Sequence, residues 1–536
     1  MSKSVTRRSF VTGTSVAAAA MAANAIVSTA SAAEVPANIE WTGEADVVVL
    51  GTGGGGLAAG ITMAAEELGS CIVLEAAPEW LRGGNSRVCG SILLIPIEGD
   101  GLAEYQTDLN GKYSVEPELI NAWAQQLQEN YDWLTDVCDF NLVVTPNCNP
   151  EYPERPGCDD VEVYVNGEIG GSRVWLGLAE AADDYGVNII YDSRGTELIT
   201  AEGIGVIGVR TEDGRAYKAK KGVILACGGF EANKELIRKY YQIGITDLYP
   251  RGSFYNRGDG IIMAEKVGAQ LWHMNNFVGN AWGIQLDPED EYANFSMSLK
   301  ANDYIFIGPD GCRFQSEDDS KRMRHGKINT GGVWLNLEMP TPSYLVFGQK
   351  TYDGGLPTPP GIGFQSVVTE GNIPSMEDLV ERGIIAKCEN AADLAAITGF
   401  DADVLQGTLD RWNGFAAAGE DRDFGRGVER DELGYPVDHP LFNGITKIKP
   451  YELEMLEFPL YVTQLRPTFL NTQGGPKRNI NCQIVDVNDE PIPRLYGAGE
   501  LGAIYANEYN GGGNLSETIA NGRTAARHCA SLEPWE

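Results

Sequence analysis

Residues 45–77 read ADVVVLGTGGGGLAAGITMAAEELGSCIVLEAA, and this stretch decides the fold. Val47 to Leu50 form an apolar run that predicts a buried strand, and Leu57 to Leu68 predict a helix. Ile72 to Leu74 predict a second strand, which ends at Glu75. A strand, a glycine-rich turn, a helix and a second strand in this order are typical of the first unit of a doubly wound α/β domain.

Five glycines lie between the first strand and the helix, and four of them are expected to bind the cofactor: Gly51, Gly53, Gly55 and Gly56. Glycines in such a turn let the backbone approach a pyrophosphate that lies at the positive end of the helix. Glu75, 19 residues beyond Gly56, is placed to accept a hydrogen bond from a ribose hydroxyl. The stretch therefore predicts a dinucleotide site, and the alternative is a glycine-rich turn that only packs.

Further glycine-rich segments lie far along the chain. They are RGGNSRVCGS at residues 82–91, with Gly84, Asn85, Ser86 and Gly90; GVILACGGFEAN at 222–233, with Gly228; and RLYGAGELG at 494–502, with Gly499 and Glu500. A domain that binds NAD alone is complete within about 150 residues. Pieces of one site that extend over most of the chain predict FAD instead, because its isoalloxazine ring reaches far from its adenosine.

Together these motifs resemble the FAD-dependent flavoprotein family that contains soluble fumarate reductases, urocanate reductase and 3-ketosteroid dehydrogenases. The matching segments are GTGGGG (51–56), GGNS (83–86), ACGGFEAN (226–233), RGDGIIMAEKVGA (257–269), GCRFQSE (311–317), VLQGTLDRWNGFAAAGEDRDFGR (404–426) and GAGE (497–500). They run in order through residues 44–529. The resemblance implies FAD as the cofactor, no metal site, and three further FAD-binding residues: Asp259, Asn514 and Leu515.

The same resemblance implies an α/β fold in which a mobile α+β capping domain is inserted into a split, Rossmann-like FAD-binding domain. The FAD-binding domain would comprise residues 35–274 and 450–536, and the cap residues 275–449. Within the cap, Ala391 to Ala417 predict helices that break at Gly399. Residues 340–375 are rich in Pro and Gly and predict an irregular loop.

The stretch YANEYNGGGN at residues 505–514 resembles an active-site loop of this family. Fumarate-reducing members place an arginine there against a substrate carboxylate, but Asn510 stands at that position, and an amide cannot replace a bidentate guanidinium. Tyr509, Gly511 and Gly513 match the Tyr-x-Gly-x-Gly of the ketosteroid dehydrogenase branch. The resemblance implies that the Tyr509 hydroxyl and the Gly513 N–H bind a substrate carbonyl oxygen. The alternative for Tyr509 is a ring that packs over a glycine turn.

The proton donor is less clearly marked. Family members place an arginine or a tyrosine within a few residues of the position of Glu317, and here Lys321 and Arg322 follow it. The alternative for this segment, SEDDSKRMRH at residues 316–325, is an exposed charged loop. Arg322 and Tyr352 are the catalytic candidates, and Lys321 and Tyr344 share the same part of the cap.

The activity implied is reduction of the C=C bond of an α,β-unsaturated carbonyl compound: an enone, an enoate or a lactone. Flavin N5 would deliver a hydride to the β-carbon while a side chain protonates the α-carbon. Electrons would come from a separate donor, such as a membrane-associated cytochrome, the quinone pool or a small redox protein, because the sequence has no haem motif. The alternatives are a ketosteroid-type dehydrogenase running in reverse, a fumarate- or urocanate-like enoate reductase, and a non-catalytic flavin carrier.

The N-terminus indicates export. Arg7 and Arg8 precede an alanine-rich stretch that ends in Ala30-Ser31-Ala32, which resembles a twin-arginine signal peptide over residues 1–33. This predicts a protein of the periplasm or the outer face of the cell envelope, and the alternative is an irregular basic tail. The net charge of −34 argues against nucleic acid as a partner, because two polyanions repel each other.

Ten cysteines occur in the chain. Cys138, Cys148 and Cys158 are evenly spaced and could hold a cluster, but their spacing matches no iron–sulfur pattern. Twin-arginine export carries proteins that fold in a reducing cytoplasm, which disfavours structural disulfides. Isolated thiols are therefore the expected state of these residues.

Overall fold

The computed structural model describes residues 39–145, 150–168, 170–241, 248–279, 281–286, 294–296, 299, 301–317, 323–330, 333–336, 339–355, 363, 367, 374–426 and 453–536. Its largest sheet has the strand order β24-β25-β9-β1-β2-β6, with β7 and β8 attached beside β9. The strands are β1 (Gly43–Leu50), β2 (Cys71–Leu74), β6 (Ile189–Ile190), β7 (Gly195–Ala201), β8 (Gly205–Thr211), β9 (Ala216–Leu225), β24 (Gln483–Val485) and β25 (Pro491–Gly497).

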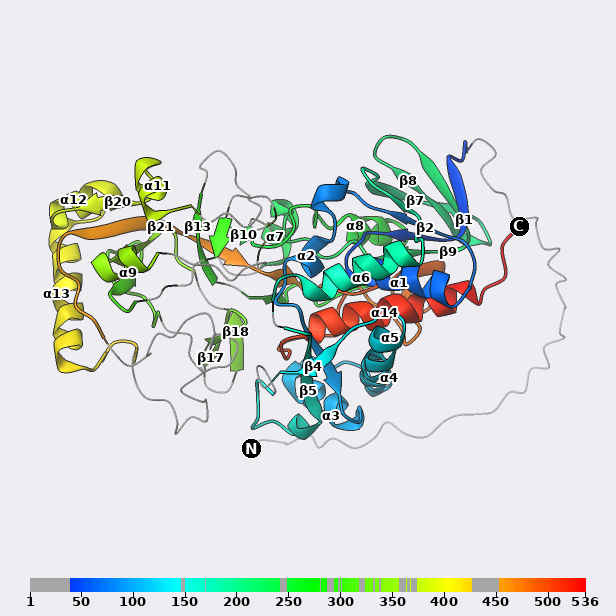
Figure 1. Ribbon diagram of the computed structural model, residues 1–536, viewed down its shortest axis with the longest axis horizontal. Coiled ribbons are helices and arrows are strands. Elements are labelled where there is room, and N and C mark those ends of the chain that lie inside the picture. The colour runs from blue at the N-terminus through cyan, green and yellow to red at the C-terminus, as the bar shows by residue number, and fades with distance from the viewer. Residues whose placement is uncertain are drawn as a thin grey trace, which may run out of the picture.

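Parallel pairing joins β1 to β2 and to β9, and β9 to β25, so the ends of the chain contribute to one sheet. The expected strand, turn, helix and strand are confirmed at β1, α1 and β2. The helices around this sheet are α1 (Gly54–Ala65), α2 (Gly84–Arg87), α3 (Asp100–Asn110), α4 (Pro117–Gln128), α5 (Asn130–Asp136), α6 (Arg173–Asp184), α7 (Lys234–Tyr240), α8 (Asp259–Lys266) and α14 (Gly513–Ala530). Figure 1 shows α1, α6 and α14 lying together over this sheet.

Helices α1 and α14 cross at two glycines. A Cβ atom added to Gly522 would lie 2.2 Å from the backbone oxygen of Gly55, so neither helix could keep its position with a side chain there. Gly56 makes a second close contact, since its Cβ would lie 1.8 Å from the backbone oxygen of Gly51. The glycine-rich sequence therefore serves helix packing as well as the turn.

We expect Gly522→Ala to lower the free energy of unfolding by about 1–3 kcal/mol, because overpacked backbone must move apart. Urea denaturation measures this effect, followed by flavin absorbance for Gly522→Ala and by tryptophan fluorescence for the control in the cap. The matched control is Gly407→Ala in α13 (Ala402–Ala418), where nothing lies within 4 Å of the added Cβ. Alanine should raise stability there by up to about 1 kcal/mol through its helix propensity. Equal effects of the two substitutions would contradict the packing argument.

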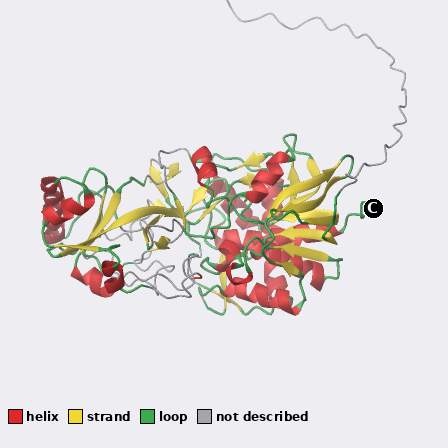
Figure 2. Cartoon of the chain, turned by 90° about the horizontal axis from the view of Figure 1, so that it is seen from above, coloured by secondary structure: helices red, strands yellow, loops and turns green. Residues whose placement is uncertain are grey.

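A second sheet belongs to the opposite end of the molecule (Figures 1 and 2). Its order is β14-β13-β21-β19-β15, and β10 and β20 also pair with β21. The strands are β10 (Tyr249–Pro250), β13 (Ala281–Gln285), β14 (Asn294–Ser296), β15 (Tyr304–Ile307), β19 (Ser343–Phe347), β20 (Ala386–Cys388) and β21 (Leu460–Phe469). Its helices are α9 (Gln349–Gly354), α11 (Met376–Glu381), α12 (Ala391–Thr398) and α13.

The cap sheet extends beyond the expected boundary at residue 450. Its central strand, β21, ends at Phe469, and Figure 1 shows β21 running from the cap towards the FAD-binding part. The helices expected over residues 391–417 are confirmed as α12 and α13, which separate at Gly399. The expected irregular loop over 340–375 is wrong at β19 and α9, because the consecutive apolar residues Leu345, Val346 and Phe347 are buried in the sheet and Gln349–Gly354 form a helix.

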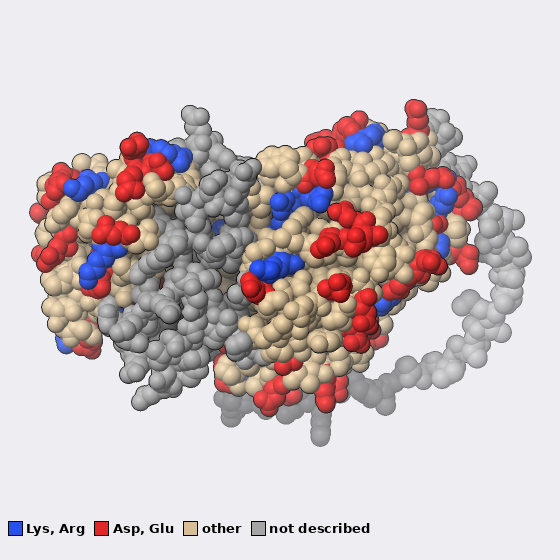
Figure 3. Space-filling view, in the orientation of Figure 1, with Lys and Arg blue, Asp and Glu red and all other residues tan. Residues whose placement is uncertain are grey.

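Smaller sheets complete the described strands. They are β3 (Ile92–Pro96), β5 (Val161–Asn166) and β4 (Leu142–Val144) in the order β3-β5-β4; β16 (Met323–Arg324), β17 (Lys327–Thr330) and β18 (Val333–Asn336); β11 (Leu271–Trp272) with β23 (Gly475–Pro476); and β12 (Phe277–Val278) with β22 (Asn471–Thr472). No helix among the described residues is long and apolar enough to cross a membrane. Figure 3 shows acidic side chains spread over both ends of the molecule on the face in view.

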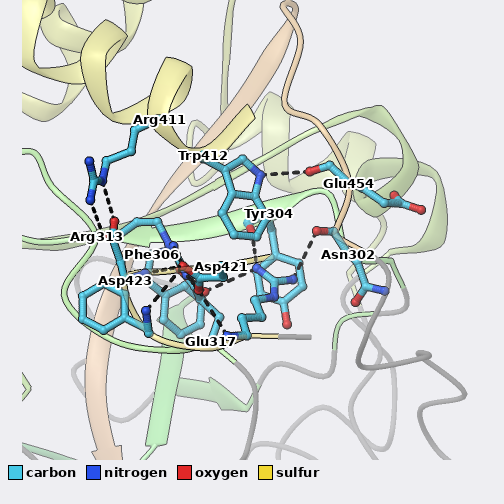
Figure 4. A network of polar contacts seen from close by, with 12 residues as sticks. Asn302, Tyr304, Phe306, Arg313, Glu317, Arg411, Trp412, Asp421, Asp423 and Glu454 are labelled. Carbon is cyan, nitrogen blue, oxygen red and sulfur yellow. Dashed lines mark hydrogen bonds and ion pairs between the residues drawn. The ribbon is translucent and has the colours of Figure 1, made fainter. Parts of the chain in front are cut away.

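A buried charge network holds the cap together (Figure 4). Arg313 donates to Glu317 at 2.9 and 2.7 Å and to Asp421 at 3.1 and 2.9 Å, and both carboxylate side chains are fully buried. Arg426 donates to the Tyr304 carbonyl and lies 3.4 Å from Glu317. These contacts tie the segment after β15 to the segment after α13, two of the motifs that carry the family resemblance.

Candidate FAD and substrate site

An elongated groove lies at the carboxyl ends of β1, β2 and β9. Its empty space, including the open mouth, is about 790 Å³. Ten of the expected FAD-binding residues line it: Gly51, Gly53, Gly55, Glu75, Gly84, Asn85, Ser86, Gly228, Asp259 and Glu500. Crevices at this edge of a parallel sheet are where nucleotides bind in α/β proteins.

The middle of the groove is built for an anion. Helix α1 begins at Gly54 with no acidic residue in its first turn, so its positive end faces the groove uncompensated. Gly51 has φ of +103°, a conformation that favours glycine, and the turn follows β1 directly. The Gly54 N–H donates to Ser86 Oγ at 2.9 Å, which ties the GGNS segment to the same turn.

Glu75 marks the adenosine end. Its Oε2 accepts from the Thr52 N–H at 2.8 Å and its Oε1 accepts from the Ala77 N–H at 2.8 Å. The Thr52 hydroxyl also donates to Oε2, whereas Oε1 keeps a second lone pair, so Glu75 can still accept from a ribose hydroxyl through Oε1. Asp259, by contrast, is held in a bidentate ion pair with Arg194 at 2.8 and 2.7 Å.

Five of the expected cofactor residues are not in the groove wall: Gly56, Gly90, Gly499, Asn514 and Leu515. Gly56 packs against the turn, and Gly499 has φ of +75° beside Thr518, a groove residue. Asn514 and Leu515 lie in the first turn of α14, and the buried Oδ1 of Asn514 has no hydrogen-bond partner among the described residues. A buried polar atom without a partner at a helix N-terminus fits a polar ligand group.

Two buried carboxylates meet at the other end of the groove. Asn85 Nδ2 donates to Glu231 Oε1 at 2.6 Å and lies 3.1 Å from Glu500 Oε2. Asn256 Nδ2 also donates to Glu231 Oε1, at 2.6 Å. Burial raises the pKa of Glu231 to about 7, and burial together with the charge of Glu231 raises the pKa of Glu500 well above its ordinary value. Asn85 and Glu500 were expected from the sequence as cofactor-binding residues, whereas Glu231 lies within the ACGGFEAN motif but was not among the expected residues.

The raised pKa of Glu231 predicts a pH-dependent stability. Its ordinary value is 4.5 and its folded value is about 7, so the folded protein keeps a proton that the unfolded chain releases. The free energy of unfolding should therefore fall by about 2–3 kcal/mol as pH rises from about 4.5 to about 7. Glu231→Gln, whose amide does not titrate, should flatten this dependence in urea denaturation at pH 5 and pH 8. An unchanged dependence in the variant would show that other groups cause it.

These residues fit FAD. The glycine turn and the start of α1 would hold the pyrophosphate, Glu75 the ribose, and the Asn85 end together with the start of α14 the polar edge of the ring system. Glycines at 51, 53 and 55 leave the backbone open to the groove.

Tyr509 lies where the FAD-binding part and the cap meet. Its side chain is 7% exposed, and its ring packs on His325 (centroids 4.4 Å apart, planes at 31°) and on Tyr505 (5.3 Å, 49°). Burial lowers the pKa of Arg251 to about 10, and the neighbouring Tyr509 partly offsets this. Arg251 also donates to the Gly279 carbonyl at 2.5 Å and stands two residues before Ser253 in the groove wall.

Gly513 has a packing role in this structure. Its N–H donates to the Asn510 carbonyl at 3.0 Å, so that N–H is already used at the start of α14. A Cβ at Gly513 would lie 2.6 Å from the Tyr505 hydroxyl, which requires a glycine there. The Tyr505 hydroxyl is itself buried without a hydrogen-bond partner among the described residues.

The polar side-chain atoms of Asn510 are hydrogen-bonded within the protein. Its Oδ1 accepts from the Tyr105 hydroxyl at 3.0 Å and from the Glu151 N–H at 2.8 Å, and its Nδ2 donates to the Gly511 carbonyl at 3.0 Å. At 1% exposed, it anchors the loop and offers no charge to a substrate carboxylate.

Of the other expected catalytic residues, Tyr352, which the structure describes, is not brought to Tyr509. Arg322 and Lys321 lie outside the described residues. Tyr352 stacks on Tyr461 within the cap, with centroids 4.2 Å apart, and belongs to a different hydrophobic cluster from Tyr509. Tyr344 donates to the Thr398 carbonyl at 3.4 Å on the side of the cap sheet that faces α12.

Residues that the sequence did not mark stand close to Tyr509 instead. His325 Nε2 lies 2.7 Å from Glu151 Oε2, and the Gly511 N–H donates to the same oxygen at 3.1 Å. Lys327, buried on the same hairpin, donates to Asn276 Oδ1 at 2.8 Å. The sequence carries one weak signal for them: His-Gly between two short strands is a turn.

The cysteines do not converge among the residues described. Cys138 is buried in one hydrophobic cluster, Cys158 packs against another, and Cys148 lies outside the described residues. No group of three or more His, Cys, Asp or Glu residues with metal-ligand geometry occurs in the described part of the chain.

Comparison with known proteins gives a consistent result. The sequence profile described as "FAD binding domain" matches residues 46–515. Digoxin reductase from Eggerthella lenta is 27% identical over 94% of this chain and 90% of its own. Urocanate reductase from the same species is 27% identical over 92% of this chain and 75% of its own.

The solved 3-ketosteroid Δ1-dehydrogenase from Sterolibacterium denitrificans superimposes with a TM-score of 0.70. The two chains are 19% identical, and the superposition covers 91% of this chain and 99% of the other. At this identity the likeness shows the fold, and the α/β fold class is confirmed. The two curated relatives reproduce the resemblance that the motifs predict.

Proposed function

Because this chain belongs to the FAD binding domain family and is an FAD-dependent oxidoreductase that acts on C=C bonds, we propose that it reduces an α,β-unsaturated carbonyl compound. The substrate would be an enone, an enoate or a lactone, and the electrons would come from a separate donor. Digoxin reductase and urocanate reductase are both named as reductases, which supports this direction.

The position of Tyr509 carries the proposal. It is a buried hydroxyl-bearing ring, on the loop that enters α14, with a cap residue packed on one face. A substrate carbonyl that accepts a hydrogen bond from Tyr509 would lie between the start of α14 and the cap. A fixed donor there stabilises the negative charge that develops on the oxygen during reduction.

FAD, when bound, supplies the hydride that adds to the β-carbon. The chain's own residues do the rest: Tyr509 orients the carbonyl, and the cap hairpin of β16 and β17 covers the loop and excludes water. Asn510 supplies no charge for a second carboxylate, which favours a substrate that binds through a neutral carbonyl over a dicarboxylate.

The match of Tyr509, Gly511 and Gly513 to the ketosteroid branch favours a second candidate. The same residues would serve dehydrogenation of a ring ketone, with electrons passed to an acceptor such as a quinone. The hydrogen bond from the Gly513 N–H to Asn510 removes one of the two carbonyl donors that this branch implies. That observation weakens the match of this loop to the ketosteroid branch, but the proposed role of Tyr509 stays the same.

We also propose export by the twin-arginine pathway, on the basis of Arg7 and Arg8 and the small residues that follow. An exported flavoprotein suits the use of an external compound as a terminal electron acceptor. The donor would then be a membrane-associated cytochrome, the quinone pool or a small redox protein.

Anaerobic reoxidation tests the proposed reaction. The purified holoprotein is reduced with dithionite, and fumarate, urocanate, a cinnamate, a 4-ene-3-ketosteroid and an unsaturated lactone are added in turn. Rapid return of the oxidised flavin absorbance with enones or lactones, and not with fumarate, is expected. Rapid reoxidation by fumarate would overturn the argument from Asn510, and no reoxidation by any member would remove the reductase proposal.

A further inference from the structure

A strained hairpin brings His325 to the site. The turn between β16 and β17 consists of His325 and Gly326, with φ of +49° and +76°. Glycine adopts this conformation freely, whereas histidine does so at a cost. A strained residue persists where its surroundings hold it, and such residues gather at functional sites.

The surroundings of His325 belong to the FAD-binding part. Its Nε2 lies 2.7 Å from Glu151 Oε2, its ring packs on Tyr509, and its carbonyl accepts from the Gly279 N–H. The His325 side chain is 15% exposed and that of Glu151 is 2% exposed. The imidazole is thus sheltered from solvent and paired with a buried carboxylate.

Glu151 is held by the same loop that carries Tyr509. Its Oε2 accepts from the Gly511 N–H at 3.1 Å, and its backbone N–H donates to Asn510 Oδ1 at 2.8 Å. The carboxylate, the imidazole and the Tyr509 ring therefore keep a fixed mutual geometry, which general acid catalysis requires.

Other charged groups around His325 have partners of their own. On its own hairpin, Lys327 Nζ lies 3.7 Å from Glu508 and donates to the Asn507 carbonyl. Arg251 donates to the Gly279 carbonyl, beside the Gly279 N–H that binds His325. Glu151 is the carboxylate in direct contact with the imidazole, and a carboxylate beside an imidazole favours the imidazolium, the form that can give up a proton.

We propose that the His325–Glu151 pair is the proton source for the substrate α-carbon, an inference that rests on the proposed reduction of an unsaturated carbonyl compound. Hydride addition at the β-carbon leaves an enolate, whose oxygen is held by Tyr509. The C–H bond at the α-carbon forms as the imidazolium N–H bond breaks, and the electron pair of the enolate supplies the new bond. Neutral His325 then regains a proton from solvent. The two electrons of the reduction come from reduced FAD, so the step needs no further reductant.

The proton step can be isolated from the redox step. Oxidised holoenzyme, given the saturated product ketone in D₂O, should exchange the α-hydrogen for deuterium, because His325 then acts as the base and Tyr509 holds the enolate. Mass spectrometry of the recovered ketone measures the exchange, and no turnover of the flavin is needed. The exchange rate should rise with pH, whereas single-turnover reduction of the enone should fall with pH.

Two variants separate titration from structure. His325→Asn tolerates positive φ and cannot exchange a proton near neutral pH. Glu151→Gln keeps an oxygen for the Gly511 N–H and loses the negative charge. We expect His325→Asn to slow exchange and single-turnover reduction by about 10²-fold and to remove their opposite pH dependences. Glu151→Gln should shift both pH dependences to lower pH.

The outcomes are distinguishable. If wild-type enzyme reduces the enone and His325→Asn keeps its rates and pH dependences, the proton assignment is wrong and the proposed function stands. If His325→Asn merely misfolds, its flavin absorbance and thermal midpoint will show it, and Glu151→Gln then decides: an unshifted pH dependence in that variant overturns the assignment. If wild-type enzyme neither reduces any enone nor exchanges any ketone, the proposed function fails first.

Discussion

Tyr509→Phe should lower kcat/KM for reduction of an enone by about 10²- to 10³-fold, the effect of removing one donor from an oxyanion site. The ring keeps its packing against His325 and Tyr505, so only the hydroxyl is lost. Single-turnover reoxidation of the reduced holoenzyme, followed at the flavin absorbance band, measures the loss directly. FAD content should be unchanged, because Tyr509 is not in the wall of the FAD groove.

A second tyrosine sharpens this test. Tyr352 was a catalytic candidate from the sequence, yet its ring stacks on Tyr461 inside the cap. Tyr352→Phe should therefore leave kcat/KM within about twofold of wild type, well below the loss of a catalytic hydrogen bond. A large loss in Tyr352→Phe, with little loss in Tyr509→Phe, would move the carbonyl site into the cap.

Arg313→Met should lower the free energy of unfolding of the cap by about 3–5 kcal/mol. In this variant the Glu317 and Asp421 side chains stay buried but lose most of the positive charge that compensates for their burial (Figure 4). Urea denaturation followed by tryptophan fluorescence measures the loss, and its signal includes Trp412, whose ring lies 4.5 Å from the Arg313 guanidinium carbon. Flavin absorbance reports the FAD-binding part in the same sample.

Arg411→Met is the matched control. Arg411 pairs with Asp423 in the same network, but its side chain is 63% exposed. An exposed pair contributes about 0–1 kcal/mol, so this substitution should have little effect. Equal losses from Arg313→Met and Arg411→Met would show that burial does not decide the contribution.

Acid should weaken the same network. Burial opposes the charge of Asp421, but hydrogen bonds from Arg313 and the Arg313 charge lower its pKa overall. A group whose folded pKa is lowered stabilises above its ordinary pKa, here 3.8, and loses that contribution as pH falls further. The difference between wild type and Arg313→Met should therefore shrink below about pH 4.

The sequence predicted the parts of the fold that depend on local pattern. The strand, turn and helix from Val47 to Leu68 follow from apolar runs and glycines, and the groove residues Glu75, Asn85 and Glu500 follow from their motifs. Glu231 was missed because its role depends on a carboxylate that lies far away in sequence.

The substrate side was harder to predict for the same physical reason. His325 and Glu151 are separated by 174 residues and meet only because the cap hairpin lies on the loop that enters α14. A histidine in a charged segment carries no sign of such a partner. Tyr352 shows the converse: its sequence neighbourhood suggested a catalytic role, and the fold turns its ring towards Tyr461.

Because β21 is the central strand of the cap sheet, it affects experiments that exchange caps between relatives to change the substrate. A cap transferred as residues 275–449 would arrive without its middle strand, because β21 spans Leu460–Phe469. The recipient's own strand would then have to pair with three foreign neighbours, β13, β19 and β20, in a register set by side chains it did not evolve beside. Chimeras whose second junction follows Phe469 carry β21 together with its partners β13, β19 and β20. We expect these chimeras to fold and to show the substrate specificity of the protein that donated the cap.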